Sequence, residues 1–110
     1  MLYGIPAQEN GYATSIMNWS IKEVIYGENE HPTQHLVGYI PYESAGRVTS
    51  DIQYFDPEAM IIHTRSGNQY LLKGEPGRHK DAEYVWSRWK SFNDAENEQD
   101  VTEQYLKQMS

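Results

Sequence analysis

The 110-residue sequence predicts an α+β fold: an antiparallel sheet of four or five strands, curled or barrel-like, with a packed C-terminal helix and a second, softer terminal helix. Three observations predict this fold. Residues 47–55 alternate apolar and polar side chains, which is typical of a half-buried strand. Two turn signals, Asp56-Pro57 and Ser66-Gly67, then separate three such runs. After residues 74–77 the apolar period changes from two to about 3.6, which indicates a helix.

The N-terminal part of the chain predicts an arm followed by two strands. Residues 1–18 mix glycine, proline and polar residues and indicate an extended arm, with a short pairing segment within 12–17. The β-branched and aromatic run 19–26 predicts a strand, although Ile21, Val24 and Ile25 also fit helical spacing. A polar connection then leads to a short apolar strand at 35–40, which Pro41 ends.

The middle of the chain predicts a three-stranded meander. In residues 47–55 the apolar face holds Val48, Ile52 and Tyr54, and the exposed face holds Thr49, Asp51 and Gln53. Asp56 and Pro57 suit the first two positions of a type I turn, so this strand folds back onto residues 59–64. Gly67 supplies the positive φ of a tight hairpin and brings residues 69–73 alongside.

The C-terminal part predicts two helices joined by an acidic segment. Asp81 is the expected N-cap of a helix that ends near residue 92. One apolar stripe of this helix would seal the core with Ala82, Val85, Trp86, Trp89 and Phe92. Residues 93–110 form an acidic segment with a last helix, for which Asp100 and Glu103 occupy capping-box positions. The predicted organisation is therefore an arm (1–18), a core domain (19–92) and an acidic C-terminal segment (93–110).

Composition restricts the classes of function. Sixteen acidic and nine basic residues give a net charge of -7, which argues against a surface that binds phosphate backbone as a whole. The chain has no cysteine, no apolar run of membrane-spanning length, and no basic and apolar leader at its N-terminus. We therefore expect a soluble, cytoplasmic protein that makes no membrane contact.

Catalytic, metal and cofactor chemistry find little support in the sequence. His31 and His35 have the spacing of helical zinc ligands, but Pro32 opposes a helix between them. No G-x-S-x-G elbow surrounds a serine, and no set of nucleophile, base and oxyanion donor can be assembled. We expect no enzyme activity, no metal and no cofactor.

Two kinds of binding surface remain as hypotheses. The favoured one is a protein-protein interface, in which an acidic surface mimics nucleic acid and docks on a basic partner. Its candidate residues are the acidic Asp94, Glu96, Glu98 and Asp100, with Arg65 and Asn68 at the rim of the second hairpin. The alternative is a nucleic-acid-binding accessory domain that uses the basic residues among the aromatics of 73–90, namely Arg78, Lys80, Arg88 and Lys90.

Residues 46–89 combine the hairpin "TRSGNQYLL" with the helix "DAEYVWSRW". This segment resembles small bacterial proteins without assigned function that pair a TRSG-x-x-Y-x-L hairpin with a DAEYVW-x-x-W helix. The resemblance implies a shared fold and lends no catalytic residue. We therefore expect an inhibitor or accessory factor of bacterial or mobile-element origin.

Overall fold

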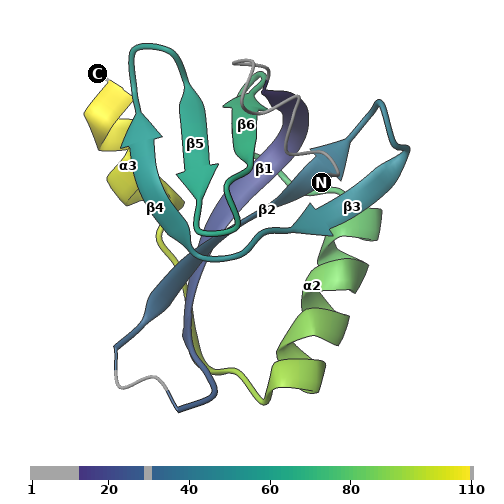
Figure 1. Cartoon of the computed structure of the whole chain (residues 1–110). Helices are drawn as coiled ribbons and strands as arrows, with labels where there is room; N and C mark the ends of the chain where they lie inside the picture. The colour runs from purple at the N-terminus through teal and green to yellow at the C-terminus, as the bar shows by residue number, and fades with distance from the viewer. Residues whose placement is uncertain (1–12, 29–30, 110) are drawn as a thin grey trace.

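The computed structural model describes residues 13–28 and 31–109, and within them it confirms the α+β class. The described residues form an open, mostly antiparallel sheet of seven strands and two helices (Figure 1). The prediction of four or five strands in a curled or barrel-like sheet is therefore wrong in strand number and in curvature. The elements are β1 (Thr14–Ile25), β2 (Thr33–Ile40), β3 (Ala45–Val48), β4 (Ile52–Asp56), β5 (Ile61–Thr64), β6 (Gln69–Leu72), α2 (Lys80–Asn93), β7 (Glu96–Asp100) and α3 (Thr102–Met109).

Strand β1 lies at the centre of the sheet, in the order β3-β2-β1-β6-β5-β4. On one side it pairs with β2 along most of its length. On the other side Thr14–Ile16 pairs in parallel with β6, and the stretch from Lys22 to Ile25 pairs in antiparallel with β7. Residues 1–12 of the predicted arm lie outside the described residues. Within the rest of the predicted arm, β1 begins at Thr14, and its pairing with β6 agrees with the short pairing segment expected within 12–17.

The predicted strand 47–55 is divided into β3 and β4, which pair with different partners. The break is at Thr49, which is buried although the alternation assigned it to the exposed face. Its hydroxyl accepts a hydrogen bond from Leu36 N (3.1 Å) and donates one to Ser50 O (2.7 Å). Tyr54, predicted for the buried face, is 59% exposed. Local alternation failed here because a side chain bonded to the main chain ends one strand pairing before the next begins.

The two predicted hairpins that follow are confirmed. Asp56 Oδ1 accepts hydrogen bonds from Glu58 N (3.1 Å) and Ala59 N (3.2 Å), as an aspartate at the first turn position does. In the second hairpin, Gly67 has a φ of 92° and its N–H donates to Thr64 O at 2.9 Å. The turn conformation at residues 65–68 is therefore set by local backbone geometry.

The two faces of the sheet pack against different helices, and each face has its own core. Helix α3 contributes Tyr105 to the larger core, where its ring lies 5.4 Å from that of Phe55. Helix α2 covers the other face with Ala82 and Trp86, and the Trp86 and Trp89 rings stack at 5.3 Å. The prediction that the aromatic stripe of α2 seals a core is confirmed for these residues.

Helix α2 differs from the prediction at both ends. Its N-cap is His79, whose Nδ1 accepts a hydrogen bond from Asp81 N at 3.1 Å, so Asp81 lies within the first turn. Phe92, predicted for the buried stripe, is 89% exposed, so the stripe does not continue to the last turn of the helix. Among the residues that the structure describes, neither helix is long and apolar enough to cross a membrane.

The acidic segment forms more structure than the sequence predicted. Residues 96–100 form β7, although a run of charged and amide side chains has low strand propensity. Pairing with β1 overrides that propensity. Asp100 Oδ1 then accepts a hydrogen bond from Thr102 N at 3.0 Å, which supports the predicted capping role of Asp100 for the last helix.

His35 is fully buried beneath α2, and both of its ring nitrogens are hydrogen-bonded. Nδ1 lies 2.8 Å from Thr49 O, and because a carbonyl only accepts, Nδ1 carries the proton. Nε2 therefore accepts from Thr33 Oγ1 at 2.7 Å. The ring also packs at 4.7 Å from Trp89. Burial holds the pKa of His35 below its ordinary value, against the weaker opposite effects of the Thr49 carbonyl and Asp51.

We predict that substitution of Gly46 by alanine destabilises the fold. A Cβ atom at Gly46 would lie 2.6 Å from both Ala82 Cα and Asp81 O, which are backbone atoms of α2 that cannot move aside alone. Gly46→Ala should lower the free energy of unfolding by about 1 to 3 kcal/mol in urea titrations. The control is Gly77→Ala, whose Cβ would meet only Asn18, with its closest atom, the side-chain nitrogen, at 3.4 Å, which is ordinary van der Waals contact. This substitution should change the free energy of unfolding by less than about 0.5 kcal/mol. Equal effects would mean that the approach of β3 to α2 is not tight.

We predict that His35 makes the fold sensitive to mild acid. Above its unfolded pKa, His35 is neutral in both states and contributes no pH dependence. Below that pKa the unfolded chain binds the proton first, so the free energy of unfolding should fall by up to about 1.4 kcal/mol per pH unit. In His35→Gln, the slope of the unfolding free energy against pH, measured between pH 7 and 5, should decrease by the contribution of about one bound proton. This holds whatever the absolute stability of the variant. An unchanged slope would contradict a depressed pKa at this residue.

Candidate partner-binding surfaces

The four acidic residues predicted to bind a partner lie along one edge of the sheet, which we call the acidic edge: Asp94, Glu96, Glu98 and Asp100. Asp94 is the C-cap of α2, with a φ of 51° and a backbone N–H directed at Lys90 O and Ser91 O. The other three lie on β7, all of whose residues are exposed. Among the described strands, β7 pairs only with β1. The fold thus places three of the predicted acidic residues on a free strand edge and Asp94 at the adjoining end of α2.

Two residues of the acidic edge are engaged within the protein. Glu98 accepts hydrogen bonds from Lys90 Nζ (2.5 Å) and Trp86 Nε1 (3.1 Å). Asp100 Oδ2 lies 3.2 Å from Nζ of Lys22, whose side chain is buried. Burial alone would raise the pKa of both carboxyls. Hydrogen bonds from Lys90 and Trp86 to Glu98, and from Thr102 and then Lys22 to Asp100, outweigh burial and hold each pKa below its usual value. Glu98 and Asp100 therefore stabilise the fold, and their charges are largely compensated.

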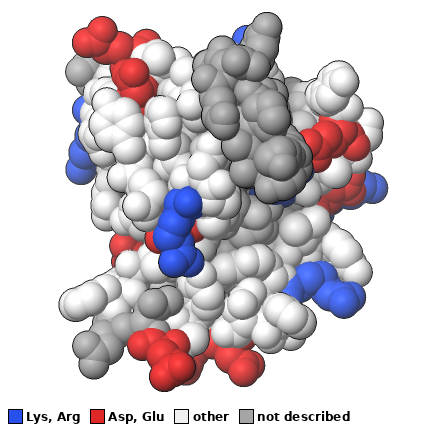
Figure 2. All heavy atoms as spheres, viewed as in Figure 1, with Lys and Arg blue, Asp and Glu red and all other residues white. Residues whose placement is uncertain are grey.

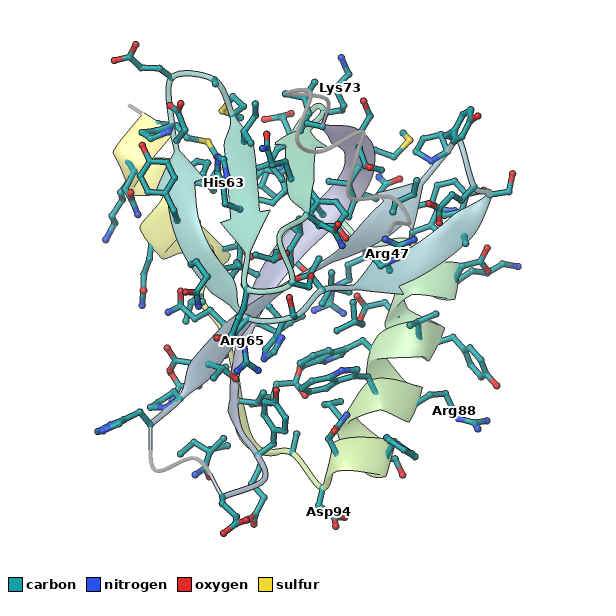
Figure 3. All side chains as sticks on the ribbon, in the orientation of Figure 1. Arg47, His63, Arg65, Lys73, Arg88 and Asp94 are labelled. Carbon is teal, nitrogen blue, oxygen red and sulfur yellow. The ribbon has the colours of Figure 1, made fainter. Side chains whose placement is uncertain are left out.

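The other two residues of the acidic edge, Asp94 and Glu96, form a second grouping with Glu28, which we call the acidic end. Ile25 pairs with Glu96, which brings the turn after β1 beside the connection from α2 to β7. All three residues are exposed, and no ion pair involves them among residues 13–28 and 31–109. Figure 2 shows acidic atoms at the lower end of the molecule, where Figure 3 places Asp94.

A groove adjoins the acidic end. It has a volume of about 410 Å³ and crosses β1 and β7. Its lining residues are Glu23, Ile25, Pro32, Asn97, Glu98 and Gln99. None of the six is basic, and two carry carboxylates. Since Glu98 is already bound to Lys90, Glu23 is the carboxylate of the groove that suits a cationic side chain.

Arg65 and Asn68, predicted at the rim of the second hairpin, are used by the hairpin itself. Arg65 Nε forms an ion pair with Asp51 Oδ1 at 2.9 Å, while the Arg65 side chain stays largely exposed (Figure 3). Asn68 O accepts hydrogen bonds from Thr64 N at 3.0 Å and Thr64 Oγ1 at 3.3 Å. Ser66 N donates to Ser50 Oγ at 3.1 Å and ties the turn to the link between β3 and β4. This set of contacts explains the turn without a ligand.

The four basic residues of the nucleic-acid hypothesis do not form one surface. Lys90 is bound to Glu98, and Arg88 Nη1 donates to Tyr84 Oη at 3.2 Å. Figure 3 shows Arg88 directed away from the sheet, whereas the tryptophans expected to stack with bases lie on the sheet side of α2. Trp86 is only 2% exposed. Arg78 lies in the loop before α2, where it lines a hollow with Asp100, and Lys80 is the first residue of the helix.

Sequence reasoning missed a cleft of about 470 Å³ between β4 and α3, which we call the β4–α3 cleft. It is lined by Gln34, Ile52, Gln53, Tyr54, Phe55, Gln104, Tyr105 and Gln108. Tyr105 Oη donates to Gln34 Oε1, and Gln34 Nε2 donates to Glu23 Oε2 at 2.9 Å. Burial, with the charge of Glu23, raises the pKa of Tyr105 to about 12, so the phenol stays protonated. The glutamine spacing at 104 and 108, one helical turn apart, was the available sequence signal.

The described residues contain no group of three or more histidine and carboxylate side chains placed to hold a metal ion. No protein-family model, no curated protein and no solved structure matches this chain. The function of the candidate surfaces is therefore inferred from the chemistry of their own residues.

We predict that the two partners of the Lys22–Asp100 ion pair respond unequally to substitution. Asp100→Asn keeps a cap acceptor for Thr102 N but leaves the buried ammonium of Lys22 without its carboxylate. It should cost about 1 to 3 kcal/mol of unfolding free energy, less than a fully buried pair because Asp100 is partly exposed. Lys22→Met removes the buried charge and leaves Asp100 solvated, so it should cost less than about 1 kcal/mol or stabilise. Equal losses in urea titrations would contradict this asymmetry.

Proposed function

We propose that this protein is a non-enzymatic protein-binding module, a small acidic inhibitor or accessory factor that docks on a partner with a basic surface. The observation that carries the proposal is the acidic end, where Glu28, Asp94 and Glu96 come from two chain segments and are exposed together. The groove beside them, which is lined by Glu23, offers a place for a lysine or arginine of the partner.

The distribution of charge supports a basic partner. Four cations of the described chain, Lys22, Arg47, Arg65 and Lys90, are each bound to a carboxylate. Within the described residues, most carboxylates form no ion pair, and they outnumber the cations that form none. Such a surface attracts a basic partner over about one Debye length, 8 to 10 Å, and its affinity falls as salt is added. A partner that normally binds nucleic acid has the required basic surface.

The alternative hypothesis is nucleic-acid binding, which would use a different surface formed by Arg78, Lys80, Arg88 and Lys90. In this hypothesis these cations would act together, yet Lys90 is bound to Glu98 and Trp86 is buried. Arg78, Lys80 and Arg88 are the three of the four that form no ion pair within the described part of the chain, and Arg88 donates a hydrogen bond to the Tyr84 hydroxyl. This alternative therefore becomes one outcome of the test below.

We predict that removing charge at the acidic end weakens partner binding. Tagged wild-type protein should retain a nuclease-resistant protein partner from cell lysate and release it as salt is raised. Asp94→Asn/Glu96→Gln should reduce the retained amount roughly five- to tenfold, because both substitutions remove charge at the contact. The matched control Glu58→Gln/Glu75→Gln removes the same charge from exposed positions elsewhere and should retain the partner.

Two results would contradict the proposal. If both double variants bind as the wild type does, the acidic end makes no contact. If nuclease removes every partner, the protein binds nucleic acid, and a salt-dependent mobility shift that is lost in Arg78→Gln/Lys80→Gln would locate the surface.

A further inference from the structure

We propose that the β4–α3 cleft binds an extended, lysine- or arginine-containing segment of a partner protein, which adds to the free edge of β4 as a further strand. This inference goes beyond docking at the acidic end, because a different surface and the main chain of the partner are involved. It rests on four observations about the cleft: its strand edge, its opposite wall, its dimensions and its charge.

The first observation is the free edge of β4. This strand is last in the strand order and pairs on one side with β5. Within residues 13–28 and 31–109, no other strand pairs with its second edge, and no backbone hydrogen bond outside the sheet ladder involves residues 52–56. An edge strand presents a row of main-chain donors and acceptors, and an extended peptide is the ligand that satisfies them.

The second observation is the wall opposite β4. Helix α3 presents Gln104 and Gln108 to the cleft, and β2 contributes Gln34. A carboxamide both donates and accepts hydrogen bonds, so this wall suits the peptide groups of a bound segment whichever way it runs. On β4 itself, Tyr54 is 59% exposed and offers an aromatic face at the rim. An edge strand facing a helix across a groove is the arrangement that strand addition needs.

The third observation is size. Strand β4 has five residues, which corresponds to an extended length of about 17 Å at roughly 3.4 Å per residue. The cleft that this strand lines has a volume of about 470 Å³. The cleft therefore accommodates a short extended segment.

The fourth observation is charge. The cleft lining has no basic residue, and Gln34 at its inner wall is hydrogen-bonded to the carboxylate of Glu23. Glu23 is not itself a lining residue, but its bond to Gln34 places a negative charge, and so a negative potential, at this wall, and it adds to the effect of burial in raising the pKa of Tyr105. Lys107, the one cation of α3, is not among the lining residues. A segment carrying lysine or arginine complements this potential, and an acidic segment does not.

The test uses the whole chain and a displayed library of random linear octapeptides. Selected peptides should be enriched in lysine or arginine, and synthetic versions should protect from hydrogen exchange those amides of residues 52–56 that point away from β5. Tyr54→Ala and Gln108→Arg, both at exposed positions, should weaken peptide binding at least tenfold in fluorescence anisotropy. The control Tyr42→Ala, 97% exposed in the turn between β2 and β3, should bind within about twofold of wild type. Backbone N-methylation of the peptide should abolish binding, because it removes the main-chain donors.

The proposal is overturned if no peptide is selected, if selected peptides bind the cleft variants as well as the wild type, or if the β4 amides stay unprotected. It is also overturned if these amides become protected without peptide as protein concentration rises, since the occupant is then a second copy of the chain. The Asp94→Asn/Glu96→Gln variant should bind the peptides within about twofold of wild type. Failure at the acidic end and failure at the cleft are thus separable results.

Discussion

The pairing of β1 with three other strands is the constraint on which the rest of the structure depends. Because β2 occupies one side of β1 along most of its length, β6 and β7 share the other side at its two ends. The sheet therefore places β4 at one end of the strand order and leaves β7 with a single described strand partner. Both candidate surfaces lie at strand edges that this sharing produces.

The same arrangement divides the core in two and explains where the charges lie. Successive side chains of β1 point to opposite faces, so Ile21 enters the core shared with α3, while Lys22 and Val24 lie on the α2 side. Lys22 is buried there and needs a counter-ion, which Asp100 supplies from the neighbouring strand. Part of the acidity of the C-terminal segment is thus a structural requirement, and only the remainder is available to a partner.

The candidate surfaces differ in what they would recognise. The acidic end offers exposed carboxylates, which attract a basic surface at long range but define little shape. The β4–α3 cleft offers main-chain groups, carboxamides and an aromatic rim, which select an extended conformation at short range. The two mechanisms are compatible in one complex, because charge guides the approach of a partner and hydrogen bonds determine its register.

Local signals in the sequence were sufficient to predict the α+β class, the two hairpins after residue 52, the α2 helix and the capping of the last helix. These features depend on turn residues and on the apolar period, which are set by residues a few positions apart in the chain. Tertiary structure alone decided the break at Thr49, whose hydroxyl bonds to β2, and the strand at residues 96–100, which forms only because β1 has an unpaired stretch beside it. It also decided which carboxylates remain available and where the cleft opens. Glu98, Asp100 and the cleft glutamines meet groups distant in the chain, and no local pattern encodes such contacts.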